Sequence, residues 1–318
     1  MIRIRELTKQ YAGITAVDRL SLDIQAGEIF GFLGPNGAGK TTTIRILSTI
    51  TLPTSGTVSI SGYDVVRQPV RAKQQIGVVH QTMNIDPDLT GIQNLLIHGM
   101  FFKMSRQRIA RRSQEVLDLV DLGGRARSRA GLYSGGMKRR LTIARALLHE
   151  PALLIMDEPT VGLDAHTRRR IWDIVRRLNR SGVTVLLTTH YIEEAQALSE
   201  RVGIIHKGRL IALGSPSELM SSRGSIAVEV EDPAGVRVEF FTSRGRAGRY
   251  VSSLEFPARV RDTSLEDVFI SMTGSRVDPG TEASGEPGCG VPGGSQSWFR
   301  AESGNRPNPG AHREGAGA

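Results

Sequence analysis

Short apolar runs alternate with stretches of helical periodicity over the first two thirds of the chain, up to about residue 214. The runs that predict strands are IRIREL, RLSLDI, EIFGFLG, TVSISG, QIGVVH, ALLIMD, VTVLLTTH and RVGIIH. Strands that alternate with helices along a chain favour an α/β fold with a largely parallel sheet. We therefore expect one α/β domain at residues 1–215.

The pattern changes to helix alone between residues 81 and 134. The segments GIQNLLIHGMFF and RIARRSQEVLDLVDL carry apolar residues three and four positions apart, and no strand-like run interrupts them. We expect a helical subdomain at about residues 82–135, inserted into the α/β domain.

A third pattern follows residue 215. The runs SIAVEVED and VRVEFFTS alternate apolar and polar residues and predict strands, and TSLEDVFISMTG predicts a closing helix. These features predict a small α+β accessory domain at residues 216–274. From 275 to 318, glycine, proline, serine and charged residues dominate without periodicity, so we expect a disordered tail.

The chain carries a surplus of positive charge. Its 318 residues include 41 Lys and Arg against 32 Asp and Glu, which gives a net charge of +9. This surplus suits phosphates, nucleic acid or anionic lipid headgroups, and charge alone does not decide among them.

The cysteine content and the apolar runs limit the compartment. Cys289 is the only cysteine, which excludes an intramolecular disulfide and a cysteine-based metal site and favours a reducing, cytoplasmic setting. No apolar run approaches the roughly 20 residues that span a bilayer, and the N-terminus MIRIRELTK lacks the apolar core of a signal peptide. We expect another chain to supply any membrane span.

The segment EIFGFLGPNGAGKTTTIRIL satisfies the pattern G-x-x-x-x-G-K-[ST] between an apolar strand and a helix. Backbone amides of such a loop wrap a phosphate chain in front of a helix N-terminus. The candidate phosphate-binding residues are Gly34, Pro35, Asn36, Gly37, Ala38, Gly39, Lys40, Thr41 and Thr42. Lys40 is expected to reach the β and γ phosphates, and Thr41 to bind Mg²⁺. The alternative is a glycine turn with an incidental lysine, which the strand-loop-helix order disfavours.

Two acids follow the apolar strand in ALLIMDEPT. Asp157 is expected to bind Mg²⁺ directly or through water, and Glu158, on the opposite side of the pleat, to act as general base for an attacking water. Without the upstream phosphate loop, a solvated strand end would be a serious alternative explanation of the pair.

Other polar residues end neighbouring strands. His190 follows VTVLLTTH, and His80 and Gln81 end QIGVVHQ. Ligands gather at the carboxyl ends of parallel strands, so His190 is a candidate γ-phosphate contact, although a lone histidine is often structural. His80 is interpreted as an ordinary strand-end residue.

The segment YSGGMKRR opens the helix LTIARALL. Ser134 could simply cap that helix. However, Lys138, Arg139 and Arg140 lie in its first turns, where the helix dipole disfavours cations, and this suggests an anion at the corner.

The motifs GPNGAGKT, Gln81, YSGGM, LLIMDEP, VGLD at 161–164 and His190 occur in this order. Together they resemble the ATP-binding subunit of an ABC transporter over roughly residues 1–215. The resemblance implies a P-loop NTPase cassette with a β-rich N-terminal part, an inserted helical subdomain, and ATP and Mg²⁺ as ligands.

The resemblance also implies roles for particular residues. Tyr11 is expected to stack on adenine, Gln81 to sense the γ-phosphate and bind Mg²⁺, and His190 to fix the attacked phosphate. The loop at Asp164 is expected to communicate across a dimer.

In this family the Ser-Gly-Gly corner holds the γ-phosphate of ATP seated on the neighbouring subunit. Ser134, Gly135 and Gly136 are therefore expected to complete the site of a second copy, in a homodimer with two shared ATP sites. Two positions depart from the common signature: Tyr133 replaces leucine and Met137 replaces glutamine. Neither change removes a Ser-Gly-Gly donor.

YSGGMKRRL, LTGIQNLLIHG and SLEDVFISMTG resemble the daunorubicin-resistance and nodulation branch, which serves ABC-2 type exporters. The implied partner is a separate transmembrane permease that exports a small molecule. The implied location is cytoplasmic, at the inner face of the cell membrane. The apolar cluster Met100, Phe101, Phe102 and Met104 could contact this permease or belong to the core.

Three other functions fit the motifs less well. A soluble ABC ATPase acting on ribosomes or nucleic acid would suit the positive charge, but such proteins carry two cassettes or long coiled-coil inserts, so no nucleic acid is expected. The signature corner excludes a plain P-loop kinase or GTPase. The intact set Lys40, Asp157, Glu158 and His190 disfavours an inactive binding module.

Overall fold

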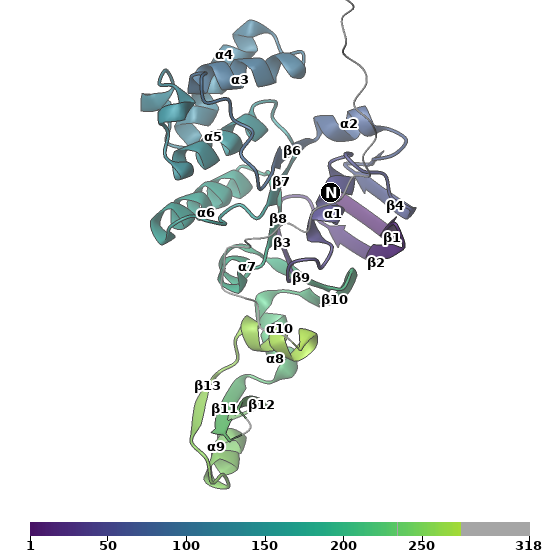
Figure 1. Ribbon diagram of the computed structural model, residues 1–318, viewed down its shortest axis with the longest axis vertical. Coiled ribbons are helices and arrows are strands. Elements are labelled where there is room, and N and C mark those ends of the chain that lie inside the picture. Colours follow the sequence, from purple (N-terminus) through teal and green to yellow (C-terminus); the bar gives the residue numbers. More distant parts are fainter. Residues whose placement is uncertain (234, 275–318) are drawn as a thin grey trace, which may run out of the picture. The chain divides into compact units, whose positions relative to one another are not determined.

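The computed structural model describes residues 1–233 and 235–274, and a six-stranded sheet lies at its centre (Figure 1). In spatial order the strands are β10 (Arg209–Gly214), β9 (Arg201–His206), β3 (Ile29–Leu33), β8 (Thr184–Thr189), β7 (Leu153–Asp157) and β6 (Ile76–Val79). All neighbours pair in parallel except β10 and β9. The predicted α/β class with a largely parallel sheet is confirmed.

A second sheet forms the β-rich N-terminal part and is wholly antiparallel. Its order is β2 (Ile14–Ile24), β1 (Ile2–Tyr11), β4 (Ser55–Ile60) and β5 (Tyr63–Asp64). Ile2 and Ile4 alternate with exposed arginines in β1, so one face of this sheet is apolar. That face shares an apolar core with α1 (Lys40–Leu47) and the central sheet.

Apolar cores cover both faces of the central sheet. Leu154 and Met156 of β7 lie in one core with helices on one side, whereas Leu153 and Ile155 lie in the other core with α1. Burial on both faces explains why β7 is a continuous apolar run and not an alternating one.

Helices form the part of the chain that was expected to be helical, and no strand lies between residues 82 and 134. The helices and short 3₁₀ turns there and beyond are α3 (Gly91–Phe101), α4 (Arg106–Leu119), η1 (Gly123–Arg125), η2 (Ala130–Leu132), α5 (Gly135–Leu147) and α6 (Ala165–Arg180). Thr90 and Gln93 form a capping box at the start of α3, and Ser105 caps α4. Two shorter helices, α2 (Pro69–Gln74) and α7 (Ile192–Leu198), flank the central sheet.

The C-terminal segment consists of α8 (Pro216–Arg223), β11 (Ile226–Asp232), β12 (Gly235–Phe241), α9 (Arg244–Ser252), β13 (Ala258–Asp262) and α10 (Leu265–Thr273). Its strands form an antiparallel sheet in the order β12-β11-β13, and α9 packs on that sheet. The sequence patterns did not predict β10, α8, α9 or β13. The predicted tail at 275–318 lies outside the described residues.

Packing across the proposed boundary at residue 215 is continuous. Leu219 of α8 and Phe269 of α10 share one apolar core with Ala195 of α7 and Val202 of β9. The helices α8 and α10 therefore belong to the same folded body as the α/β part, and only α9 with its three strands has a core of its own.

Candidate functional site

The loop between β3 and α1 is shaped by two glycines. Gly39 has a φ of 105°, and a Cβ there would lie 2.5 Å from the carbonyl oxygen of Ala16. A Cβ on Gly34 would lie 2.5 Å from the carbonyl oxygen of Ile205. No side chain caps α1 and no acid lies in its first turn. The loop and helix thus present a helix N-terminus suited to an anion.

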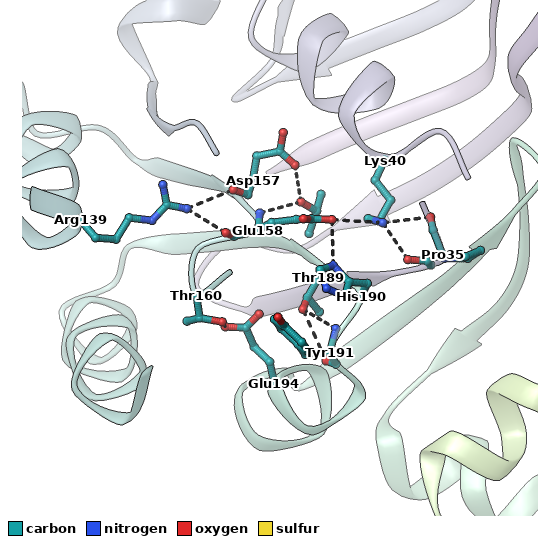
Figure 2. Close-up of polar contacts among 12 residues, drawn as sticks. Pro35, Lys40, Arg139, Asp157, Glu158, Thr160, Thr189, His190, Tyr191 and Glu194 are labelled. Atoms are coloured by element: carbon teal, nitrogen blue, oxygen red, sulfur yellow. Dashed lines mark hydrogen bonds and ion pairs between the residues drawn. The ribbon is translucent and has the colours of Figure 1, made fainter. Parts of the chain in front are cut away.

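Lys40 is the first residue of α1, and its side chain is only 4% exposed. Its Nζ donates to the carbonyl oxygens of Gly34 at 2.7 Å and Pro35 at 3.0 Å, and lies 3.4 Å from Glu158 Oε1 (Figure 2). Burial lowers the pKa of the ammonium, although Glu158 and Asp157 partly oppose this effect.

Asp157 and Glu158 leave the sheet at the end of β7. The hydroxyl of Thr188 on β8 donates to Asp157 Oδ1 at 2.6 Å, and the Glu158 amide donates to the Thr188 carbonyl at 3.1 Å. Glu158 lies beyond the strand with a φ of 46°, so the expected placement by strand alternation was wrong. A left-handed turn, rare for a residue with a side chain, directs this carboxylate.

His190 follows β8 and faces the same carboxylate. Its Nδ1 lies 3.1 Å from Glu158 Oε1, and both side chains are 11% exposed. Burial raises the pKa of the Glu158 carboxyl, but His190 and the Lys40 ammonium favour the charged form more strongly, so that pKa lies below its usual value. The ends of β3, β7 and β8 thus bring Lys40, Glu158 and His190 into contact (Figure 2).

Arg139, one of the three cations that follow the Ser-Gly-Gly corner, binds backbone carbonyl oxygens. Its guanidinium is buried and donates to five carbonyl oxygens, those of Asp157, Glu158, Pro159, His80 and Gln81. Burial lowers the pKa of Arg139 to about 10, although Glu194 and Asp157 oppose this. Arg140 likewise donates to the carbonyls of Val120 and Asp121. Neither arginine therefore requires an external anion, and that part of the sequence argument was wrong.

The Ser-Gly-Gly corner lies away from this contact set. Ser134 caps α5 by accepting from the Met137 amide at 3.3 Å, and Ser134 and Gly135 are exposed. A Cβ on Gly136 would lie 2.5 Å from the Thr167 side chain, so the starts of α5 and α6 pack closely. Among the described residues, no hydrogen bond or ion pair joins the corner to Lys40. Figure 1 shows α1 and α5 on different sides of the central sheet.

Other candidate residues are also exposed. Asp164 caps α6 by accepting from the Thr167 amide and hydroxyl, at 2.9 and 2.7 Å. Tyr11 ends β1 and is 40% exposed, with Lys9 Nζ 4.8 Å from its ring centre. The side chains of Gln81, Thr41 and Asn36 are open to solvent. Within the described part of the chain, no hydrogen bond or ion pair joins these side chains to Lys40, Glu158 or His190.

Comparison with known proteins points to one family. A family model described as ABC transporter matches residues 17–161. The Nod factor export ATP-binding protein I of Cupriavidus metallidurans is 42% identical over 299 residues, covering 87% of this chain and 98% of that protein. The chain belongs to the ABC transporter family. The linearmycin resistance ATP-binding protein LnrL of Bacillus subtilis is 40% identical over 272 residues, covering 86% of this chain and 84% of its own length.

Solved structures agree with this family. The ATP-binding cassette MJ0796, in a dimeric post-hydrolysis state bound to ADP and Pi, is 30% identical with a TM-score of 0.62, covering 68% of this chain and 98% of that one. The protein cbiO1 of Clostridium perfringens is 26% identical with a TM-score of 0.64, covering 69% and 89%. The predicted family and fold are confirmed, and the chain is an ATP-binding, ATP-hydrolysing subunit of an ABC transporter. Within the described residues, no helix has the length and apolar character that a membrane crossing demands.

Tyr133 and Met137, the two residues that depart from the ABC signature, pack in the core of the helical part. Tyr133 is 4% exposed, packs in the core of the helical part, and donates its hydroxyl to the Arg125 carbonyl at 2.7 Å. Gly91 makes room for that hydroxyl, because a Cβ there would lie 2.7 Å from it. Met137 packs against the same core.

Several residues that position the site of this ABC ATPase were not predicted from the sequence. Thr188 donates to Asp157, and Trp172 and Thr160 donate to Glu194. Arg139 was noticed only for its charge. The one available signal was the run of polar residues at the end of β8, where Thr188 precedes Thr189 and His190.

A hollow of about 370 Å³ lies between the ATPase core and the helical part of the cassette. Its lining includes His98, Phe102, Arg145 and His149. Phe102, which follows α3, stacks on His149 with ring centres 3.8 Å apart, whereas Phe101, the last residue of α3, is 80% exposed. The apolar cluster of α3 is therefore divided between core and surface.

The two histidines of this hollow should make the cassette sensitive to acid. Burial lowers the pKa of His98 to about 3 and that of His149 to about 4, from 6.5. Arg145 and Arg108 lower these pKa values further, and the Ile76 carbonyl opposes the effect at His149 only in part. The unfolded chain therefore binds protons below pH 6.5 that the folded chain refuses, so stability falls as pH drops from 6.5 toward 4. Each histidine contributes at most about 1.4 kcal/mol per pH unit.

Urea unfolding at pH 7 and pH 5 measures this effect. His98→Phe keeps an aromatic ring beside Phe102 and removes one titrating group, so its free energy of unfolding should change less between the two pH values than that of the wild type. An equal change in both proteins would contradict the assignment.

Proposed function

We propose that two copies of this chain close around two molecules of Mg²⁺-ATP and drive small-molecule export through a separate ABC-2 type permease. One observation carries the proposal. The chain assembles Lys40, Glu158 and His190 in one buried contact set, while Ser134, Gly135 and Asp164 stand exposed outside it. A site divided in this way is completed by a second copy with two-fold symmetry.

Each residue of the proposed site has a distinct task. Lys40 and the loop amides from Gly34 to Thr42 bind the phosphates, and Tyr11 stacks on adenine. The hydroxyl of Thr41 and the carboxylate of Asp157 are oxygen donors of the kind that Mg²⁺ prefers, and Gln81 adds an amide oxygen. Bound Mg²⁺ would neutralise phosphate charge.

Hydrolysis is assigned to Glu158 and His190. The pKa of Glu158 is depressed, so the carboxylate is ionised at neutral pH and able to accept a proton from water. The Nδ1 atom of His190 lies 3.1 Å from this carboxylate, and His190 contacts the attacked phosphate and fixes its position.

The second copy supplies Ser134, Gly135 and Gly136. The Ser134 oxygen accepts from the Met137 amide, which leaves its own proton free to donate to a phosphate oxygen. The similar cassette MJ0796 supports the pairing, since it forms a dimer in its post-hydrolysis state.

The permease is proposed to contact the surface of α3. Met100 and Phe101 are 60% and 80% exposed, and large apolar side chains on a surface suit a protein contact. The curated relatives are named for Nod factor export and for linearmycin resistance, which supports an export role. The chain would then be peripheral, on the inner face of the cell membrane.

Co-purification from detergent-extracted membranes tests this partner. The wild-type chain should retain a multi-span membrane protein, and Phe101→Ser should lose it while keeping basal ATP hydrolysis, because Phe101 contributes little to the core. Phe102→Ser is the contrasting variant: it removes the stack on His149 and should lower the melting temperature.

Two results would count against the proposal. One is equal retention of the membrane protein by wild type and Phe101→Ser. The other is recovery of ribosomes or nucleic acid in its place, which would favour a soluble ABC ATPase.

A further inference from the structure

Glu194 is the most deeply buried carboxyl group among the described residues, with no exposed surface. Its Oε1 accepts two hydrogen bonds, from the Thr160 hydroxyl at 2.8 Å and from the Trp172 indole at 3.1 Å. Figure 2 shows Thr160 and Glu194 directed toward one another beneath the loops that carry Glu158 and His190. The proposed hydrolysis does not use this group.

The two hydrogen bonds join three segments of the site. Thr160 lies two residues after Glu158. Trp172 belongs to α6, which Asp164 caps. Glu194 itself lies on α7, four residues after His190. One oxygen atom thus links the segments of Glu158, Asp164 and His190.

The surroundings of Glu194 favour a role as a hydrogen-bond acceptor over a role as a negative charge. Burial raises the pKa of the carboxyl, while the nearby Thr189 hydroxyl, the two donors Thr160 and Trp172 and the charge of Arg168 oppose this only in part. Its Oε2 has no hydrogen-bond partner in the described chain. Both donors therefore depend on Oε1, which a neutral amide could replace.

We propose that Glu194 is a positioning residue that fixes the Asp164 loop, Glu158 and His190 relative to one another, so that closure by a second copy at Asp164 sets the geometry of the hydrolytic pair. The proposal rests on the dimeric function proposed above. A rival explanation is that Glu194 only fills a buried space and satisfies Thr160 and Trp172, which would affect folding but not turnover by folded molecules.

Steady-state ATP hydrolysis separates these explanations. Glu194→Met keeps the volume and removes the acceptor, so kcat per folded molecule should fall about ten- to a hundredfold while KM for ATP changes by less than about twofold. Glu194→Gln keeps an oxygen for both donors and should retain kcat within about threefold. Glu193→Met is the matched control, because the Glu193 side chain on the same helix is 73% exposed.

A second variant tests the same connection if Glu194→Met fails to fold. Thr160→Val removes one donor and keeps the shape of the side chain, and it should lower kcat in the same direction. The double variant Glu194→Met with Thr160→Val should be no slower than Glu194→Met alone, because both changes break one connection.

Three results would overturn the proposal. The first is wild-type kcat in Glu194→Met and Thr160→Val. The second is a Glu194→Gln variant as slow as Glu194→Met, which would show that charge and not the acceptor matters. The third is a fall in melting temperature with unchanged kcat per folded molecule. Sedimentation of the same proteins with ATP tests the proposed function independently. Absence of any dimer would refute that function, whereas the kcat comparison would still show whether Glu194 affects turnover.

Discussion

Glu158→Gln should lower ATP turnover by about 10²- to 10⁴-fold, the usual contribution of a general base. Glutamine matches the size of glutamate, but it cannot accept a proton from water at neutral pH. The change also removes a negative charge that lies 3.4 Å from Lys40 Nζ and 3.1 Å from His190 Nδ1. The Thr188 contact of the residue is made by its backbone amide and is unaffected. The site should therefore keep its backbone structure and lose the group that accepts the proton.

The same variant should accumulate as an ATP-bound dimer. In the proposed dimer, the phosphates bind to Lys40 and to the corner of a second copy without Glu158, whereas release depends on hydrolysis. Sedimentation with Mg²⁺-ATP should show a dimer of Glu158→Gln and a monomer with ADP. Glu115→Gln, the same change at a half-exposed site on α4, is the control and should behave as the wild type. A Glu158→Gln protein that stays monomeric with ATP, or turns over normally, would contradict the proposed mechanism.

Arg139→Met should cost about 3 kcal/mol or more of stability, because several buried carbonyl oxygens would lose a charged donor at once. It should also reduce turnover by the molecules that remain folded. The carbonyls of Asp157, Glu158 and Pro159 form the turn that directs Glu158, and Arg139 also binds the backbone at Gln81. Thermal unfolding and kcat per folded molecule measure the two effects.

Arg140→Met is the matched control for that variant. Arg140 is the next residue of the same helix and is also buried, but its carbonyl partners Val120 and Asp121 lie just after the end of α4. Its loss should lower the melting temperature and leave kcat per folded molecule unchanged. If Arg139→Met also kept its kcat, Arg139 would serve only the fold.

The elements that the sequence predicted well are those set by local patterns. The run LLIMD reads as a buried strand because it is apolar on both faces, and β7 is buried on both faces. The glycine loop, the acid pair and His190 each follow a strand, and parallel strands bring their carboxyl ends together. That rule was sufficient to expect Lys40, Glu158 and His190 near one another, as the structure places them.

The elements that were missed depend on contacts distant in sequence. α9 contains Gly245 and Gly248, which weaken a helix, and it forms where Ala247 and Tyr250 pack on β11. Arg139 reaches carbonyls near residue 80, too far along the chain for any local pattern to reveal. Glu194 lies in the first turn of α7, where an acid is normally exposed to solvent and interacts favourably with the helix dipole. Its burial is a result of the tertiary fold, which no local pattern reveals.

The end of the described chain is mechanically close to the chemistry. Phe269 on α10 shares an apolar core with Ala195 on α7, the helix that begins two residues after His190. A displacement of α10 would therefore be transmitted through packed apolar side chains to the helix that follows His190. A change in the position of α10 should therefore alter the position of His190 beside Glu158.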